Sequence, residues 1–164
     1  MKRVYESAVS YARTFSTASE SLLFMGATGL GKTLLSGCIA RAVADRGYSV
    51  CYVSAGKLFS DFETEKFRLK EDGALTGEYL QTDLLIIDDL GTEMTTQFTV
   101  SALYQIVNGR LLSGKPTIVS TNLPDTELEA RYSAQIASRL LGAYTLYQFC
   151  GTDVRLLRKM ESRG

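Results

Sequence analysis

The segment GATGLGKT at residues 26–33 constrains the fold of this chain more than any other feature of the sequence. A short apolar run, residues 22–25, precedes it and is expected to form a buried strand. After it, from Thr33 to Arg46, apolar residues recur at helical spacing, and they are Leu34, Leu35, Cys38, Ile39, Ala42 and Val43. Glycines let backbone N–H groups converge on phosphate oxygens, and a helix N-terminus adds partial positive charge at the same point. Strand, glycine-rich loop and helix in this order therefore predict a phosphate-binding loop.

The residue types in this loop indicate ATP or ADP with Mg²⁺ as ligands. Lys32 is expected to reach the β- and γ-phosphates, and the hydroxyl of Thr33 is expected to ligate Mg²⁺. A glycine-rich turn that binds nothing is the alternative, and the flanking strand and helix argue against it. Nine residues are predicted to contact the nucleotide: Gly26, Ala27, Thr28, Gly29, Leu30, Gly31, Lys32, Thr33 and Leu34.

Composition limits the classes of protein that this chain can represent. With 164 residues, 45% hydrophobic and 22% charged, the chain is typical of one globular domain. No apolar run reaches the length of a membrane span and residues 1–6 lack a signal-peptide core, so we expect a cytoplasmic protein without membrane association. The net charge is zero, so any binding of nucleic acid must come from a local basic patch.

The chain contains three cysteines and no histidine. Cys38, Cys51 and Cys150 lie inside apolar runs, and their spacing is not that of metal ligands. Buried, unreactive thiols in a reducing cytoplasm are therefore expected.

Apolar periodicity and turn residues divide the chain into alternating helices and strands, which predicts a three-layer α/β fold with a parallel central sheet and helices on both faces. The expected helices are residues 2–15, 33–46, a segment from Ser54, 96–112, a short one from Pro124, 133–141 and a terminal one after Asp153; the expected strands are 22–25, 49–53, 83–89, 117–120 and 144–150.

The strand at 83–89 ends in two carboxylates, Asp88 and Asp89. Four consecutive apolar residues before them imply a strand covered on both faces, as in a parallel sheet. Open α/β sheets bind ligands at the carboxyl ends of their strands, and acids there are costly to bury without a metal. Asp88 is therefore predicted to help hold Mg²⁺, and Asp89 to act as the general base or to position the attacking water. A polar turn after a core strand is the alternative.

A further polar residue, Asn122, follows the strand at 117–120. At that end of a neighbouring strand, its side chain can reach the γ-phosphate and the attacking water. A simple turn residue is the competing interpretation, because asparagine favours turns.

Five segments follow one another in a characteristic order, and they are Gly26–Thr33, Leu84–Asp89, Ser120–Asn122, Ser138–Leu140 and Gly151–Arg155. This order resembles the AAA+ ATPases and covers nearly the whole chain. Residues 85–93 (LIIDDLGTE) and 151–155 (GTDVR) narrow the resemblance to the DnaC/DnaI-type bacterial helicase loaders and the IstB transposition-helper ATPases.

The resemblance implies roles for three side chains. Asn122 would be the sensor-1 residue, and Arg139 would be the arginine finger that acts on ATP held by a neighbouring subunit. Arg155 would be the sensor-2 arginine in its own subunit. Two fixed guanidinium groups fit the chemistry, because hydrolysis spreads negative charge over the phosphoryl oxygens. Arg131 competes with Arg139 for the finger role.

The chain departs from the family pattern in three ways. The second acid, Asp89, is usually glutamate in AAA+ proteins, so we expect slow turnover or assistance from Glu93. The helical lid domain is missing, as in the helicase loaders, and so is the N-terminal domain that grips the helicase. Residues 1–164 are therefore expected to be one ATPase domain, the C-terminal module of a longer protein.

These patterns predict the ATP-hydrolysing domain of a DNA replication helicase loader that self-associates through its ATP sites on single-stranded DNA. The implied partner is a replicative helicase of the DnaB type. An IstB-like transposition helper and an ATP-gated assembly module with little hydrolysis are the alternatives. A small-molecule kinase would need a second substrate pocket and an arginine-bearing lid, for which the sequence offers no clear counterpart.

The segment from Lys57 to Arg68 is the expected DNA-binding surface. Lys57 and Lys66 can follow a phosphate backbone, and phenylalanines at 59, 62 and 67 are interleaved with the cations for base stacking. Acids at 61, 63 and 65 would repel phosphate, and the spacing of Leu58, Phe59 and Phe62 equally fits a helix packed into the core.

Overall fold

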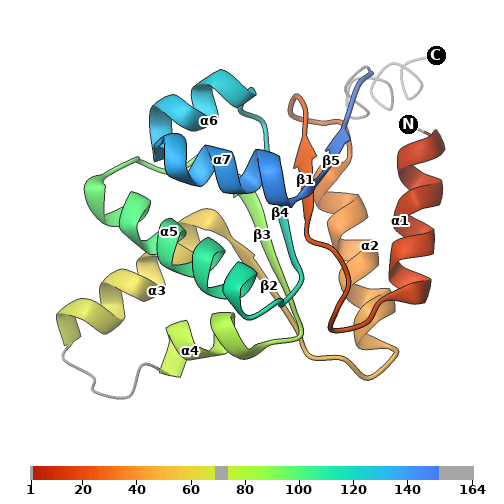
Figure 1. Cartoon of the computed structure of the whole chain (residues 1–164), viewed down its shortest axis with the longest axis horizontal. Coiled ribbons are helices and arrows are strands. Elements are labelled where there is room, and N and C mark those ends of the chain that lie inside the picture. Colours follow the sequence, from red (N-terminus) through yellow and green to blue (C-terminus); the bar gives the residue numbers. More distant parts are fainter. Residues whose placement is uncertain (1, 69–73, 152–164) are drawn as a thin grey trace, which may run out of the picture.

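The computed structural model describes residues 2–68 and 74–151, and its centre is a parallel five-stranded sheet in the order β2-β3-β4-β1-β5 (Figure 1). All four pairings of neighbouring strands are parallel. The strands are β1 (Leu22–Met25), β2 (Val50–Ser54), β3 (Leu84–Leu90), β4 (Thr117–Thr121) and β5 (Thr145–Gln148).

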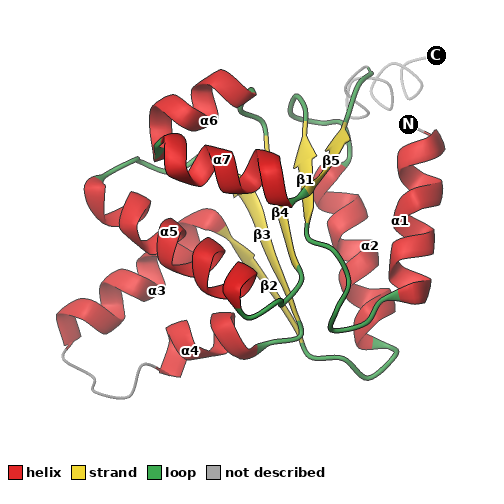
Figure 2. Ribbon diagram, viewed as in Figure 1, coloured by secondary structure: helices red, strands yellow, loops and turns green. Residues whose placement is uncertain are grey.

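Helices cover both faces of the sheet, which confirms the predicted three-layer architecture (Figure 2). Two helices, α1 (Lys2–Thr14) and α2 (Lys32–Ala44), lie on one side, with α1 packed on α2. The others lie on the opposite side: α3 (Ala55–Arg68), α4 (Ala74–Gln81), α5 (Gln97–Leu112), α6 (Asp125–Tyr132) and α7 (Ala134–Ala143).

Strand β3 contributes to two separate hydrophobic cores. Leu84 and Ile86 pack with residues of α1 and α2, whereas Leu85 and Ile87 pack with residues of α3, α5 and α7. All four side chains are fully buried. Because alternate residues of a strand face opposite ways, an uninterrupted apolar run is what a doubly covered strand requires.

Most element boundaries differ from the predicted ones by one or two residues. Thr96 caps α5 through a reciprocal pair of hydrogen bonds with Thr99, which places the start of that helix at Gln97. The predicted strand at 144–150 is shorter, since β5 ends at Gln148. The predicted terminal helix lies outside the described residues.

The expectation that the cysteines are buried is wrong. Cys38 and Cys150 are exposed, and Cys51 is partly buried. Helix α2 turns Ile39 and Val43 inward, so Cys38, one position before Ile39, faces outward. Apolar neighbours in sequence therefore did not define the buried face of this helix.

A buried cation lies at the amino ends of β3 and β4. Arg110, on α5, has no exposed surface, and its guanidinium group donates hydrogen bonds to backbone and side-chain oxygens. Burial lowers the pKa of this group to about 10. The accepting atoms are Tyr79 O, Leu80 O, Thr82 O, Asp83 O, Pro116 O and Thr117 Oγ1.

Among the helices within the described residues, none combines the length and the apolar character that crossing a membrane requires.

Candidate functional site

The loop between β1 and α2 has the conformation that its glycines allow. Gly26, Gly29 and Gly31 have φ angles of 148°, 83° and 93°, which side chains disfavour. Gly26 also packs against the segment after β5, where an added Cβ would lie 2.4 Å from the carbonyl oxygen of Phe149. The glycines are therefore needed for the path of the backbone as well as for access to a ligand.

Lys32 begins α2 and bends back over this loop. Its ammonium group donates hydrogen bonds to the carbonyl oxygens of Gly26 and, at 2.9 Å, of Ala27. Lys32 is only 5% exposed, and burial lowers its pKa, while the nearby carboxylates of Asp89 and Asp88 oppose that shift. The ammonium group thus contacts the loop, and the charges of the two acids of β3 act on it.

The two residues after Lys32 face outward at the start of α2. Thr33 is exposed, so its hydroxyl is available to a ligand, and Leu34 is 71% exposed. Leu34 belongs to the apolar stripe predicted for this helix, but it lies on the side turned away from the sheet.

Asp88 is buried at the carboxyl end of β3 and is held by hydroxyl groups from both neighbouring strands. Ser120, on β4, donates to Oδ1 of Asp88, and Tyr52, on β2, donates to Oδ2 at 2.7 Å. Burial and the hydrogen bond to Asp88 raise the pKa of the Tyr52 hydroxyl. Asp88 is 5% exposed.

Asp89 lies at a bulge in the pairing of β3 with β4, where the register shifts between Ile87 and Leu90. Its φ angle of 56° is left-handed, and its backbone N–H donates to Oγ of Ser120 at 2.9 Å. Two successive residues of a regular strand point to opposite faces. Here the bulge leaves Asp88 buried and Asp89 exposed at the carboxyl end of the strand.

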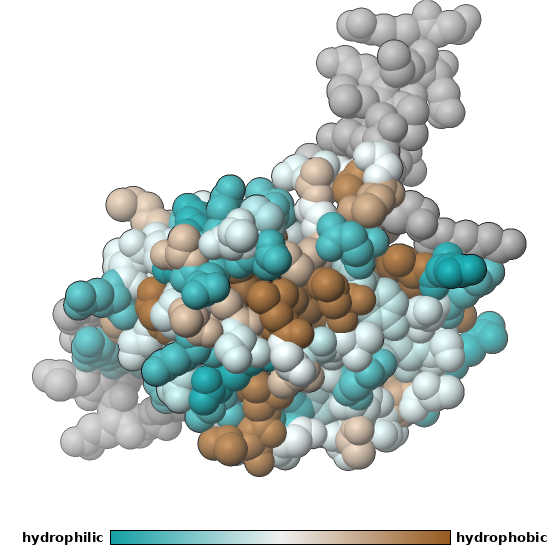
Figure 3. Space-filling view, turned by 45° about the horizontal axis from the view of Figure 1, so that its top comes forward, coloured by the Kyte–Doolittle hydropathy of each residue, from teal (hydrophilic) through white to brown (hydrophobic). Residues whose placement is uncertain are grey.

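Asn122 is exposed and directly follows β4, the strand between β1 and β3. Together with Gly26 and Ala27 it lines a cavity of about 450 Å³ at the carboxyl ends of the strands. Leu141 and Leu146 lie at its other side and are partly exposed. Figure 3 tilts this end of the molecule toward the viewer and shows hydrophobic surface among hydrophilic side chains.

The predicted loop, Asp88, Asp89 and Asn122 therefore meet at the carboxyl ends of three adjacent strands, β1, β4 and β3. The donor set fits Mg²⁺, which prefers oxygen ligands and is often bound through one or two carboxylates and substrate phosphates. Within residues 2–68 and 74–151, there is no cluster of three acidic, histidine or cysteine side chains that could hold a metal by itself. Oxygens of a bound phosphate would complete the ligands of a Mg²⁺ ion at this position.

Glu93 and Arg131 hold the loop after β3 against α6. The carboxylate of Glu93 accepts hydrogen bonds from the Tyr132 hydroxyl and from the Gly91 N–H, the latter at 3.1 Å. Arg131 donates to the carbonyl oxygen of Gly91. Both oxygens of Glu93 thus have partners within the loop and α6.

Arg139 lies on α7 and contacts α5. Its guanidinium group donates to Oδ1 of Asn108 at 3.0 Å and to the Tyr104 hydroxyl at 3.2 Å, and it stacks over the Tyr104 ring at 4.8 Å. These contacts hold the partly buried side chain on the surface formed by the two helices. Arg155, the other predicted arginine, lies outside the described residues.

The predicted DNA segment divides into core residues and exposed cations. Phe59 and Phe62 are buried, 4% and 7% exposed, so the expectation that they stack on bases is wrong. Their spacing places them on the face of α3 that packs on the sheet. The side chains of Phe67 and Arg68 lie outside the described part of the structure.

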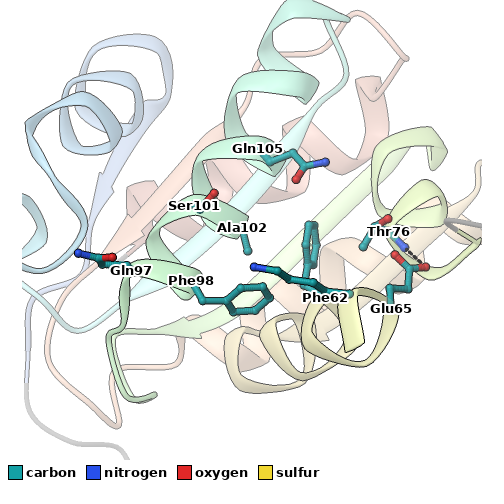
Figure 4. Close-up of a pocket in the computed structure, with 9 residues that line it drawn as sticks. Phe62, Glu65, Thr76, Gln97, Phe98, Ser101, Ala102 and Gln105 are labelled. Carbon is teal, nitrogen blue, oxygen red and sulfur yellow. Dashed lines mark hydrogen bonds between the residues drawn. The ribbon is translucent and has the colours of Figure 1, made fainter. Parts of the chain in front are cut away.

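Lys57 and Lys66 are both exposed. Lys57 forms an ion pair with Asp61 one helical turn on. Lys66 lies over the ring of Phe98 at 5.1 Å. Both residues line a cavity of about 740 Å³ between α3 and α5, and Figure 4 shows Phe98 and other residues of its lining. Polar side chains, including Gln97 and Gln105, line the same cavity.

Sequence reasoning missed Tyr52, Ser120 and Arg110. Tyr52 and Ser120 read as ordinary strand residues, and only the pairing of β2, β3 and β4 brings their hydroxyls to Asp88. The burial of Arg110 could have been predicted from helical periodicity. It lies on the same face of α5 as Leu103, Ile106 and Val107, which are all buried.

Comparison with known proteins identifies relatives over most of the chain. The family model described as IstB-like ATP binding protein matches residues 7–146. An ATP-binding protein of an insertion sequence from Mycobacterium tuberculosis is 30% identical over 105 residues, 64% of this chain and 41% of that protein. The replicative helicase loader DnaC of Escherichia coli is 27% identical over 132 residues, 79% of this chain and 54% of that protein. The chain thus spans about half the length of the curated relatives it matches.

Solved structures share the fold. The DnaC helicase loader superposes with a TM-score of 0.82 at 20% identity, covering 91% of this chain and 89% of that chain. The AMPPCP-bound DnaA of Aquifex aeolicus gives 0.80 at 20% identity, covering 98% and 49%. The fold is that of the AAA+ P-loop domains, and with a family match over residues 7–146 the chain belongs to the family of IstB-like ATP-binding proteins, which is related to the helicase loaders.

Proposed function

We propose that residues 1–164 form one ATPase module that binds ATP with Mg²⁺, hydrolyses it and assembles on single-stranded DNA as part of a cytoplasmic bacterial helicase loader. The observation that carries the ATPase proposal is the juxtaposition of three groups. Lys32 donates to carbonyl oxygens of the glycine-rich loop, and the charges of Asp88 and Asp89 act on it. Membership of a family of ATP-binding proteins supports ATP as the ligand of this site.

Each residue of this site has a role in the proposed reaction. Lys32 and the backbone N–H groups of residues 26–34 bind the phosphates, with Thr33 and Asp88 holding Mg²⁺. The ion, when bound, neutralises charge on the phosphate oxygens. Asp89 is exposed at the rim, where its carboxylate accepts a proton from water or orients it, and Asn122 contacts the γ-phosphate.

Two features favour Asp89 over Glu93 as the acid that acts on water. Asp89 is exposed and lies near Lys32, whereas both carboxylate oxygens of Glu93 accept hydrogen bonds from the Tyr132 hydroxyl and the Gly91 N–H. A carboxylate engaged in this way is less available as a base. Slow turnover follows from the short side chain at position 89.

Measured ATP turnover tests this proposal. Wild type should release phosphate only with Mg²⁺. Lys32→Ala should bind ATP at least about tenfold more weakly, because it loses the cation on the phosphates. Asp89→Asn should bind ATP normally and turn over slowly, because its loss lies in the transition state. Unchanged ATP affinity in a folded Lys32→Ala variant would contradict the site, and wild-type turnover in Asp89→Asn would transfer the role to Glu93.

We also propose that ATP sites form between subunits, with Arg139 reaching the nucleotide of a neighbour and Arg155 acting within its own subunit. Arg139 lies at the surface formed by α5 and α7, and its guanidinium group must exchange its hydrogen bonds to Asn108, Gln135 and Tyr104 to reach a neighbour's nucleotide. Mixing Arg139→Ala with Lys32→Ala subunits should restore part of the activity. No recovery in mixed oligomers formed on DNA would contradict a finger acting between subunits.

The DNA proposal depends on exposed cations. Lys57→Ala with Lys66→Ala should weaken binding of single-stranded DNA and lower its salt dependence, because fewer counterions are released. Affinity for ATP should be unchanged. Binding equal to that of wild type at several salt concentrations would exclude this surface.

A transposition helper is the second function that a specific observation favours, because one relative is an ATP-binding protein of an insertion sequence and the matching family is IstB-like. Such a protein should bind duplex DNA and a transposase, whereas the loader should prefer single strands and a replicative helicase. Competition between single- and double-stranded oligonucleotides for the ATP-bound protein distinguishes the two. An assembly module that binds ATP with little hydrolysis would bind DNA in an ATP-dependent way without phosphate release.

A further inference from the structure

We propose that Tyr52 and Ser120 are positioning residues that fix the orientation of the Asp88 carboxylate for Mg²⁺. The inference rests on the proposed function, since it presumes that Asp88 serves a nucleotide-bound ion. It adds two side chains, from the strands on either side of β3, for which the sequence predicted no role.

The pairing of strands brings the three side chains together. Ser54 of β2 is the register partner of Asp88, and Tyr52 lies two residues earlier on the same face of the sheet. The Tyr52 hydroxyl donates to Oδ2 of Asp88 at 2.7 Å, and the Ser120 hydroxyl donates to Oδ1. Each carboxylate oxygen is thus held by a different strand.

The direction of the Ser120 hydrogen bond follows from its other partner. Oγ of Ser120 accepts the N–H of Asp89 at 2.9 Å, so its own proton is directed to Asp88. The same serine therefore fixes the backbone of Asp89 and the carboxylate of Asp88. This contact joins the two acids of the site at one hydroxyl group.

Tyr52 also approaches the other predicted ligand of Mg²⁺. Its hydroxyl oxygen lies 3.5 Å from the carbonyl oxygen of Thr33 and 2.7 Å from Asp88. The single phenolic proton goes to the carboxylate, the closer and charged acceptor. Tyr52 is 40% exposed, so its ring borders the open site and spans from β3 to the start of α2.

Within the described part of the chain, the Asp88 carboxylate is held by neutral groups. No lysine or arginine within residues 2–68 and 74–151 forms an ion pair with it. Two hydroxyl donors leave lone pairs on each oxygen, which can accept hydrogen bonds from waters bound to a cation. Mg²⁺ keeps several waters in strict octahedral geometry, so the direction of those lone pairs matters.

A second tyrosine–aspartate pair shows a carboxylate whose counter-ion comes from the protein itself. The Tyr79 hydroxyl donates to Oδ2 of buried Asp61 at 2.5 Å, and Lys57 pairs with the other carboxylate oxygen. There the cation comes from the protein and the pair links α3 to α4. This pair provides a matched control for Tyr52 and Asp88.

The test compares Tyr52→Phe and Ser120→Ala with Tyr79→Phe as the control. Binding of a fluorescent ATP analogue is titrated against Mg²⁺, and thermal unfolding is measured for each variant. Tyr52→Phe should raise the Mg²⁺ concentration at the midpoint by about tenfold, as expected when an outer-shell partner of a metal ligand is lost. Nucleotide binding in EDTA should equal that of wild type.

Ser120→Ala should also raise the Mg²⁺ concentration at the midpoint. Tyr79→Phe should lower the unfolding temperature and leave that Mg²⁺ midpoint unchanged. An unshifted midpoint in folded Tyr52→Phe, or an equal shift in Tyr79→Phe, overturns the inference while the proposed ATP site stands. If nucleotide binding by the wild type does not depend on Mg²⁺, the proposed function is overturned and the inference with it.

Discussion

The two ends of the central sheet each bury a charged side chain, and they satisfy it differently. At the amino ends of β3 and β4, Arg110 has no exposed surface, and oxygens from α4, from the segment between α4 and β3 and from the start of β4 surround its guanidinium group. At the carboxyl end, Asp88 is 5% exposed, and two neutral hydroxyls hold its carboxylate.

The difference separates a structural charge from a functional one. Arg110 has five N–H donors, and the chain supplies acceptors that are neutral and mostly backbone carbonyls. Asp88 accepts two hydrogen bonds and lies beside another acid, Asp89, with Lys32 as the nearby cation that opposes their charge. A buried charge whose partners are complete stabilises the fold, whereas one with free lone pairs at an open edge is available to a ligand.

Replacing Arg110 should have the largest effect on stability. Arg110→Ala leaves several buried carbonyl oxygens without donors and opens a cavity, so it should cost at least about 3 kcal/mol in the free energy of unfolding. Urea denaturation measures the loss. Arg41→Ala is the control, because Arg41 is exposed in a surface ion pair with Asp45 and should change stability by less than about 1 kcal/mol. Equal small losses in both variants would remove the contrast between the two ends of the sheet.

Asp88→Asn should show the opposite profile at the other end. It removes a buried charge, so the free energy of unfolding without nucleotide should stay equal or rise. Turnover should fall about a hundredfold, roughly 2.7 kcal/mol, because the ion loses its charged protein partner. Phosphate release and urea denaturation on the same samples give both numbers. A variant that loses stability as much as activity would make Asp88 a structural residue like Arg110.

Asp89 offers a smaller test of strain at the functional end. Its φ angle of 56° suits glycine, so Asp89→Gly should stabilise the protein by about 0.5–1 kcal/mol while abolishing turnover. Ser133→Gly is the matched control, since Ser133 has a φ angle of 98° and makes no side-chain cap hydrogen bond on α7. It should stabilise the protein and preserve turnover. A loss of stability in Asp89→Gly would show that the aspartate side chain supports the bulge.

The smallest effect is expected from lowering the pH, which acts on Asp83 at the amino end of β3. Hydrogen bonds from the Ser49 N–H and hydroxyl hold the pKa of Asp83 below its ordinary value of 3.8. A carboxyl whose pKa is lower in the folded state stabilises the protein above pH 3.8 and loses that contribution as the pH falls through the folded pKa. Asp83→Asn should therefore be less stable than wild type near neutral pH, and the gap should close in acid. A gap that is constant with pH would exclude the charge as its cause.

The sequence predicted the layered fold and the phosphate loop because those features depend on short-range patterns. Uninterrupted apolar residues at 84–87 require cover on both faces, and the glycines at 26, 29 and 31 are compatible with positive φ angles. Helical faces were harder to assign. The stripe assigned to α2 included Leu34 and Cys38, which are exposed, because moderate hydrophobicity on both sides of the helix obscures which side is buried.

The sequence by itself determined that loop, strand and helix alternate, that two acids lie near the end of β3 and that an asparagine follows β4. Those features are local, since they require only periodicity and the backbone preferences of glycine. The tertiary structure alone decided which strands are neighbours, and thereby that Tyr52 and Ser120 meet at Asp88 and that Phe59 and Phe62 are core residues. Side chains 32 or more residues apart become hydrogen-bond partners only through the order of the strands, which no local pattern encodes.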